Sequence, residues 1–484
     1  MEFSIFHIPI LAFLAYSLQK LCVAYFHPLS NVPNAHFTTP LSRAWLLVQK
    51  YRGCENHARH AAHKRLGPII RLGPHELSIN SIEGVQTVYN NSSFERTEWF
   101  LNAFRGREAP FMVCMLRTKE HGSRKRMMAS IYMKTYIQNS PVIKSLVIDV
   151  FQKSFRNELA KWAVDALTVD VMQAFQPCVT DFTTGWLFGI KARTDWLHNK
   201  SEANTFYRNF ERSGADDAQQ NLRQWSNEMC QKSLKTADAK NDICQDGGAT
   251  HKASVCSELH THLRKTENPE ATATFLKDEM LDHVIANQIA TAIVLTYVTY
   301  SLSLNPLWQT KLRSELNNLS TPQNEKFPSP RDLDSLPILD AIITETLRLY
   351  SPNPGPWPRH HPTSSCQING GYTIPARTTI SASSYTLHRN DSVFPDPEEW
   401  KPERWLEAST EQRAGMMKWF WAFGSGTRMC IGSNLALLSL KAVVKVIYSE
   451  FETEIVDGSG MEQMDSVIAG PVGDKLLLKF VKVK

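Results

Sequence analysis

The sequence predicts a mainly α-helical protein with a minor share of β structure, and three observations support this. Residues 142–235 repeat apolar side chains at spacings of three and four, which is typical of helices with one buried face. Residues 275–304 form a longer helical pattern whose C-terminal part carries no charge, as expected for a helix that crosses the interior. Strand-like pieces occupy only residues 67–80, around a Gly-Pro turn, and a hairpin at residues 371–375.

The composition is that of an ordinary globular protein and excludes several classes. The chain has 484 residues, of which 42% are apolar and 21% charged, and its net charge of +5 is too mild to argue for nucleic-acid binding. Its 9 cysteines contain no Cys-x-x-Cys pair, which argues against a disulfide scaffold or a zinc site and for a reducing compartment.

The N-terminal stretch differs from the rest of the chain. Residues 5–26 are largely apolar and long enough to span a bilayer. Glu2 precedes this stretch and basic residues follow it, which favours a cytoplasmic location for the bulk of the protein. A cleaved signal peptide is the competing interpretation, but the basic start and the small-x-small cleavage site are missing.

We therefore expect three segments. These are a membrane anchor at residues 1–26, a proline-punctuated linker at residues 27–41 and the main domain at residues 42–484. The expected location is the endoplasmic reticulum membrane, crossed once, with the main domain in the cytoplasm.

A helix is predicted over residues 42–66, and it places His57, His60 and His63 on one face. Three histidines could suggest a metal site. No cysteine or carboxylate clearly completes a ligand set, so a solvated or membrane-facing surface is the favoured interpretation.

One glycine-rich stretch, residues 423–432, presents a single cysteine just before an apolar helical run. Glycine permits tight turns and close approaches that a Cβ would forbid. A cysteine near a helix N-terminus lies where backbone amides and the helix dipole favour the thiolate. Such a thiolate suits an axial haem ligand.

This stretch resembles the cysteine-ligand loop of the cytochrome P450 haem-thiolate enzymes, Phe-x-x-Gly-x-Arg-x-Cys-x-Gly. The fixed positions are filled by Phe423, Gly426, Arg428, Cys430 and Gly432. The resemblance covers nearly the whole chain. It implies the cytochrome P450 fold, mainly α with a small β-rich lobe, a haem-thiolate catalytic domain at residues 42–484, and haem b with Cys430 as the axial ligand of the iron.

A second motif lies in the helix predicted at residues 337–350. Glu345 and Arg348 are three apart among apolar residues, so the pair is expected to be buried and to need further partners. Arg404, in a Pro-Glu-Arg-Trp stretch, can supply one. These residues resemble the structural Glu-Arg-Arg triad of the family, which braces the proximal side of the haem.

The resemblance also implies which residues hold the haem propionates, because two carboxylates at the edge of an apolar pocket require charged partners. The expected residues are His121, Lys125, Arg359, His388 and Arg428. Arg124 and Arg126 are candidates for a basic proximal surface that docks an acidic flavin domain. Residues 97–116 are expected over the distal side, and residues 354–357 are expected to line the substrate pocket.

The long uncharged helix corresponds to the family helix that passes over the haem, with the usual pattern Ala-Gly-x-acid-Thr. Residues 286–290 read Ala-Asn-Gln-Ile-Ala, so the glycine is Asn287, the acid is Ile289 and the threonine is Ala290. In the family, the acid and threonine order the water that brings protons to dioxygen, which these apolar side chains cannot do. The side chain of Thr291 should point in another direction than that of residue 290, because successive residues of a helix are rotated by about 100° around its axis.

Three explanations stay open at this distal site, where Asn287, Ala290 and Thr291 are the candidate catalytic positions. A substrate hydroxyl, or Asn287 with bound water, relays the protons. Alternatively, the enzyme performs desaturation, radical coupling or a rearrangement, which depend less on that relay. The third explanation is weak activity.

The function implied by the resemblance is a membrane-bound monooxygenase that oxidises a hydrophobic secondary metabolite, as filamentous-fungal members do. A terpenoid, polyketide or alkaloid fits this class. No GxGxxG or flavin motif is present, so electrons are expected from NADPH–cytochrome P450 reductase, with cytochrome b5 as a second candidate donor. A haem sensor or carrier without turnover is the alternative from a different class.

Overall fold

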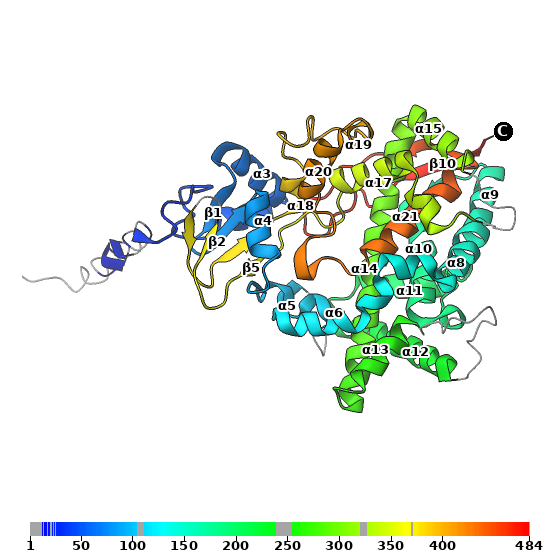
Figure 1. Ribbon diagram of the computed structural model, residues 1–484, viewed down its shortest axis with the longest axis horizontal. Coiled ribbons are helices and arrows are strands. Elements are labelled where there is room, and N and C mark those ends of the chain that lie inside the picture. Colours follow the sequence, from blue (N-terminus) through cyan, green and yellow to red (C-terminus); the bar gives the residue numbers. More distant parts are fainter. Residues whose placement is uncertain are drawn as a thin grey trace, which may run out of the picture.

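The computed structural model describes residues 12, 14–16, 18, 19, 22, 24, 26–103, 111–238, 254–319, 327–368 and 371–483. Most of the predicted anchor, residues 1–26, lies outside these ranges. Within them, the one helix that is long and apolar enough to span a membrane is α14 (Pro269–Leu304), and it is mostly buried in the protein. Figure 1 shows a β-rich lobe at one side of the molecule and a larger helical body, with α14 inside it, at the other.

The β-rich lobe is built around a five-stranded sheet with the strand order β1-β2-β8-β5-β3. Its strands are β1 (Ile69–Gly73), β2 (Glu76–Ile79), β3 (Glu95–Arg96), β5 (Arg359–His360) and β8 (Thr379–Ser381). The antiparallel hairpin of β1 and β2 is the one predicted at residues 67–80. At the far edge, β3 pairs with β5 so that Arg96 lies directly opposite Arg359.

Two smaller sheets complete the β structure that the model describes. One has the order β4-β10-β9 and joins distant parts of the chain, and the other is the hairpin of β6 and β7, which agrees with the hairpin predicted at residues 371–375. Their strands are β4 (Val169–Asp170), β9 (Phe451–Asp457), β10 (Leu477–Lys482), β6 (Cys366–Ile368) and β7 (Tyr372–Ile374).

Helices make up most of the molecule, as predicted. Besides α14 they are α2 (Ala44–Tyr51), α3 (Glu55–Leu66), α4 (Ile82–Tyr89), α5 (Trp99–Ala103), α6 (Thr118–Tyr132), α7 (Lys134–Asn139), α8 (Pro141–Leu146), α9 (Arg156–Val164), α10 (Val171–Phe188), α11 (Lys200–Glu211), α12 (Asp216–Asp238), α13 (Val255–Leu263), α15 (Pro306–Asn317), α16 (Pro330–Asp334), α17 (Pro337–Leu349), α18 (Ser384–Leu387), α19 (Glu403–Leu406), α20 (Thr410–Trp419) and α21 (Ser433–Tyr448). A π-helical stretch, η2 (Val147–Phe155), joins α8 to α9.

The helix α14 begins six residues earlier than the pattern at residues 275–304 predicted. Pro269 is its first residue, and the side chain of Asn268 accepts a hydrogen bond from the N–H of Ala271 at 2.8 Å. Proline is favoured at this position because the N–H it lacks would have no partner in the helix. The helix is buried along most of its length between α10, α12, α17 and α21, as the lack of charge predicted.

The predicted helix over residues 42–66 is two helices, α2 and α3. Gly53 lies between them with a φ of +64°, a left-handed conformation that favours glycine and ends the first helix. On α3 the histidines are separated: His57 contacts Asp465, whereas His63 is buried and bonds Gly67 O and Ser78 Oγ, each at 2.9 Å. The solvated surface expected for all three is therefore wrong for His63.

The linker predicted at residues 27–41 contains no helix or strand beyond one bridge, from Asn34 to Arg71. It is not a free hinge, however. Leu29 and Val32 are buried in the core of the β-rich lobe, and the backbone pairs with β1 through Pro33 O and the N–H of Ala35. The linker thus packs onto the main domain.

Candidate haem-thiolate site

The cysteine loop, residues 423–432, is a tight turn closed by a hydrogen bond from the N–H of Cys430 to Phe423 O at 2.9 Å. A short 3-10 turn, η4 (Gly426–Arg428), precedes the cysteine, and α21 begins at Ser433. Gly426 has a φ of +67°, and a Cβ there would lie 2.1 Å from Tyr89 O, so only glycine fits. The loop is therefore pressed against the end of α4.

Cys430 is accessible at its side chain although it lies deep among protein atoms. Burial raises the pKa of its thiol, whereas the N–H groups of Gly432 and Ser433 and the charge of Lys125 act to lower that pKa. The start of α21 and one lysine thus favour the thiolate, the form that binds a metal.

Basic side chains, most of them buried, form a cation cluster beside this loop. Arg96 and Arg359 are paired across β3 and β5, and His121 lies on α6; all three side chains are buried. Arg428 of the cysteine loop completes the cluster. Burial first, and then the charges of the three arginines and Lys125, lower the pKa of His121 to about 2, so its ring is neutral. In the same way, burial followed by the charge of Arg359 lowers the pKa of Arg428 to about 9.

No carboxylate forms an ion pair with any of these four residues in the part of the chain that the model describes; Glu95 and Asp282 act on them only from farther away. Three of their buried polar atoms have no hydrogen-bond partner, namely Arg96 Nε, His121 Nδ1 and Arg428 Nε. Other nitrogens of these arginines donate to backbone carbonyls, for example Arg96 to Val113 O and Arg428 to Leu116 O, but a carbonyl does not neutralise the charge. Like charges opposite each other in a sheet are destabilising, and so are buried charges without a counter-charge. The cluster is therefore suited to an anionic group, and the two propionates of a haem fit it.

Lys125, the fifth predicted cation, lies differently. Its ammonium donates hydrogen bonds to Thr427 O at 3.2 Å and to Met429 O at 2.7 Å. Lys125 therefore braces the cysteine loop from α6. Its neighbour Arg124 is buried, with its guanidinium 4.6 Å from the centre of the Phe275 ring, so the expected place on a basic proximal surface is wrong for Arg124. Arg126 is exposed.

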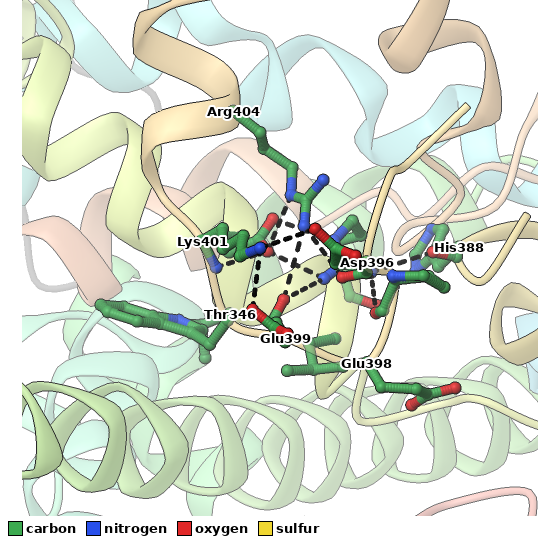
Figure 2. A network of polar contacts seen from close by, with 12 residues as sticks. Thr346, His388, Asp396, Glu398, Glu399, Lys401 and Arg404 are labelled. Carbon is green, nitrogen blue, oxygen red and sulfur yellow. Dashed lines mark hydrogen bonds and ion pairs between the residues drawn. The ribbon is translucent and has the colours of Figure 1, made fainter. Parts of the chain in front are cut away.

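The structure brings the triad of Glu345, Arg348 and Arg404 together at the end of α17. Figure 2 shows the polar network around it, with Arg404, Lys401 and His388 labelled. Arg348 forms two hydrogen bonds to Glu345, at 2.8 and 2.9 Å, and Arg404 Nε donates to Glu345 Oε1 at 3.0 Å. Burial alone would raise the pKa of Glu345, but the hydrogen bonds and charges of the two arginines outweigh it and lower that pKa. Breaking such a buried pair costs roughly 3–5 kcal/mol because one charge is left uncompensated.

His388 belongs to this network rather than to the propionate cluster. It is fully buried; its Nδ1 donates to Arg348 O at 2.8 Å, and its Nε2 accepts from the N–H of Trp421 at 2.7 Å. Both ring nitrogens are engaged, so the expected propionate role is wrong for His388. Because Nε2 accepts, the ring is neutral, and burial lowers its pKa to about 3.

On the distal side, the polar candidates turn away from the cysteine loop. Thr291 Oγ1 donates to Asn287 Oδ1 at 2.8 Å, and Asn287 Nδ2 donates to Thr183 Oγ1 of α10. Both polar ends of Asn287 are thus engaged, one within α14 and the other in the contact between α14 and α10. Ala286 is exposed although α14 around it is buried, and Asp282, one turn earlier, acts on Cys430, so this face of α14 looks toward the thiolate.

Two features of the site were missed in the sequence. Arg96 belongs to the cation cluster, but in the sequence it is one arginine after a mostly polar segment, residues 90–95, and its pairing with Arg359 spans more than 260 residues of chain. Glu279 and His283 lie four apart on α14, which places them on one face, yet only the structure reveals their partner Tyr132 on α6.

The site and the fold define a class of protein, and comparison with known proteins agrees. Residues 36–477 match the family model of cytochrome P450, so the chain belongs to that family. Relatives of this chain within the family are monooxygenases from fungi. The cytochrome P450 monooxygenase FGM1 of Gibberella zeae is 27% identical over 87% of this chain and 86% of its own length. The cytochrome P450 monooxygenase ankB of Aspergillus thermomutatus is 26% identical over 93% of this chain and 89% of its own length.

Proposed function

We propose that the protein is a monooxygenase that holds haem b and oxidises a hydrophobic secondary metabolite with O2 and electrons from NADPH. The observation that carries the proposal is the largely buried cluster of Arg96, His121, Arg359 and Arg428 beside Cys430, which forms no ion pair with a carboxylate among the residues that the structure describes. A flat group with two carboxylates and a metal that takes a thiolate meets all of these needs at once.

The residues of this chain have distinct roles in that proposal. Cys430 binds the iron, and the cation cluster holds the propionates. When bound, haem supplies oxygen activation, for which the thiolate donates electron density. Lys125 and the triad keep the cysteine loop in place: Lys125 binds the carbonyls of the loop, and the triad reaches it through His388 and Trp421.

Proton delivery is the least usual part of the proposed mechanism. Ile289 and Ala290 cannot hold a proton-carrying water, and Asn287 and Thr291 are bonded to each other and to Thr183. This favours a hydroxyl of the substrate as the proton donor over Asn287. The same lack of a proton-carrying group equally supports a second candidate reaction. This is a desaturation, a radical coupling or a rearrangement, which depends less on proton delivery.

The proposed setting is the endoplasmic reticulum membrane, with NADPH–cytochrome P450 reductase as electron donor and cytochrome b5 as a second one. The apolar stretch at residues 5–26 supports a membrane location. The substrate class, a terpenoid, polyketide or alkaloid, rests on the resemblance to fungal members and on the fungal relatives.

Reconstitution with the reductase tests the function. We expect NADPH consumption that depends on both proteins and on O2, and that rises with a true substrate. Mass spectrometry of the product separates the two reactions, since hydroxylation adds one oxygen atom and desaturation removes two hydrogens. Haem-loaded protein that consumes no NADPH with any candidate substrate would instead indicate a sensor or carrier.

A further inference from the structure

A chain of three polar side chains connects α14 to the end of α6 and has no part in the function proposed above. Tyr132 is buried, and its hydroxyl lies 2.9 Å from His283 Nδ1. His283 Nε2 faces Glu279 Oε1 at 3.4 Å, and the side chains of both are at least nine-tenths buried. The other oxygen of Glu279 accepts from the N–H of Met112 at 2.9 Å.

The contact of 3.4 Å between His283 Nε2 and Glu279 Oε1 is an ion-pair contact and not a hydrogen bond, and neither atom has a hydrogen-bond partner among the described residues. A carboxylate can only accept, so its nearness still favours a proton on His283 Nε2, which leaves Nδ1 as the acceptor for the Tyr132 hydroxyl. A phenol that donates to an imidazole backed by a carboxylate can transfer its proton over one hydrogen bond. The resulting imidazolium would be stabilised by the charge of Glu279. Such an attraction between charges is stronger in a dry protein interior than in water.

Tyr132 also lies next to the thiolate site. Asn434, on the first turn of α21, donates to Tyr132 O at 3.1 Å. Burial first, and then the charge of Cys430, raise the pKa of Tyr132. Tyr132 thus packs against the first turn of the helix that follows the cysteine loop.

Aromatic rings continue from Tyr132 toward the surface. The Trp186 ring of α10 lies edge-on to Tyr132, with 6.5 Å between the ring centres, and Tyr136 of α7 lies 5.9 Å from Trp186. Trp186 is buried and Tyr136 is partly exposed. The three rings thus form a path from the thiolate site to the outside.

We propose that Tyr132, Trp186 and Tyr136 form an electron-transfer route that returns the haem centre to its resting state when oxygen is activated without oxidation of a substrate. Tyr132 gives one electron to the oxidised haem centre while its O–H bond breaks and the proton moves to His283 Nδ1. Trp186 then gives an electron to Tyr132, which takes its proton back from His283. Tyr136 replaces the electron of Trp186 and releases its phenolic proton to water, and a soluble thiol at the surface restores Tyr136 with a hydrogen atom. Two such passages are needed: two thiols supply two electrons and end as a disulfide, and two protons from water reach the haem site, so that the activated oxygen atom leaves as water.

Such a route has a clear use in this chain. The distal positions Ile289 and Ala290 lack the usual groups that control proton delivery, so activation without product formation is expected to be frequent. The inference rests on the proposed haem-thiolate function.

The test uses the haem-loaded enzyme and peracetic acid, which oxidises the haem without a reductase. Samples frozen within milliseconds are examined by electron paramagnetic resonance, with and without ring-deuterated tyrosine. We expect a tyrosyl signal that narrows on deuteration, is lost in Tyr132→Phe and is strongly reduced in His283→Gln, which keeps the phenol but removes the base. Bleaching of the haem should become several-fold faster in both variants.

Tyr89→Phe is the matched control. Tyr89 is also buried and its ring lies 4.8 Å from that of Trp421, beside the cysteine loop, but its hydroxyl donates to the carbonyl of Trp357, which cannot take a proton. The tyrosyl signal of the Tyr89→Phe variant should equal that of the unchanged enzyme. A tyrosyl signal that persists in Tyr132→Phe would overturn the route, as would no protein radical although peracetic acid changes the haem spectrum. Failure of the unchanged protein to hold haem would count against the proposed function instead.

Discussion

Buried histidines show how surroundings decide the role of one residue type. His121 and His388 were both assigned to the propionates by resemblance, and both are buried. His121 lies among three arginines with Nδ1 unpartnered, which suits an anionic ligand. His388 uses both nitrogens to join the triad to the chain before the cysteine loop. The difference depends on which atoms face each ring, and sequence spacing does not reveal that.

His388 should make the protein sensitive to acid. Its pKa is about 3 in the folded protein and 6.5 ordinarily. The unfolded chain therefore binds more protons between these values, so stability is full above about pH 6.5 and falls as the pH is lowered toward about pH 3. One pH unit below 6.5 the loss from this group is about 1.4 kcal/mol.

The check is thermal unfolding across this pH range in His388→Gln, whose amide can donate and accept but does not titrate. The variant should lose less stability on acidification than the unchanged protein. Equal pH slopes for the two proteins would show that His388 does not contribute.

The elements that hold the site differ in how far their sequence predicts them. The cysteine loop, α17 with its first-turn proline and the uncharged part of α14 follow from local patterns, because local backbone chemistry decides them. The break between α2 and α3 was missed, since one glycine ended a pattern that otherwise continued. The pairing of Arg96 with Arg359 and the contact of Tyr132 with His283 arise from packing between distant segments, which periodicity does not report.

Two glycines of the cysteine loop offer a paired test of this element. Gly424 and Gly426 have similar φ values, +69° and +67°, but a Cβ on Gly424 meets nothing within 4 Å, whereas on Gly426 it would meet Tyr89 O at 2.1 Å. Gly424→Ala should cost only the strain of a left-handed conformation, roughly 1–2 kcal/mol. Gly426→Ala should cost more and also weaken haem retention, because the loop must move off α4.

Haem content after gel filtration and the midpoint of thermal unfolding measure both effects. Equal losses in the two variants would mean that the contact with Tyr89 is unimportant. The comparison is sharp because the backbone strain is nearly the same at both positions.

At the scale of the whole molecule, the site lies where the β-rich lobe and the helical body meet. The lobe supplies Arg96 and Arg359, α6 supplies His121 and Lys125, and the loop before α21 supplies Arg428 and Cys430 (Figure 1). No segment holds the cluster alone, so its three arginines and His121 come together only when both parts fold against each other. A bound dianion would therefore stabilise the whole fold, since it binds the folded state and not the unfolded chain.

The most direct test of the account is the difference spectrum that carbon monoxide produces with the reduced, haem-loaded protein. Thiolate ligation by Cys430 predicts the red-shifted Soret band, and Cys430→Ala should lose it while Tyr132→Phe keeps it. A reduced protein that binds haem and carbon monoxide without that band, or a Cys430→Ala variant that retains it, would contradict the central claim.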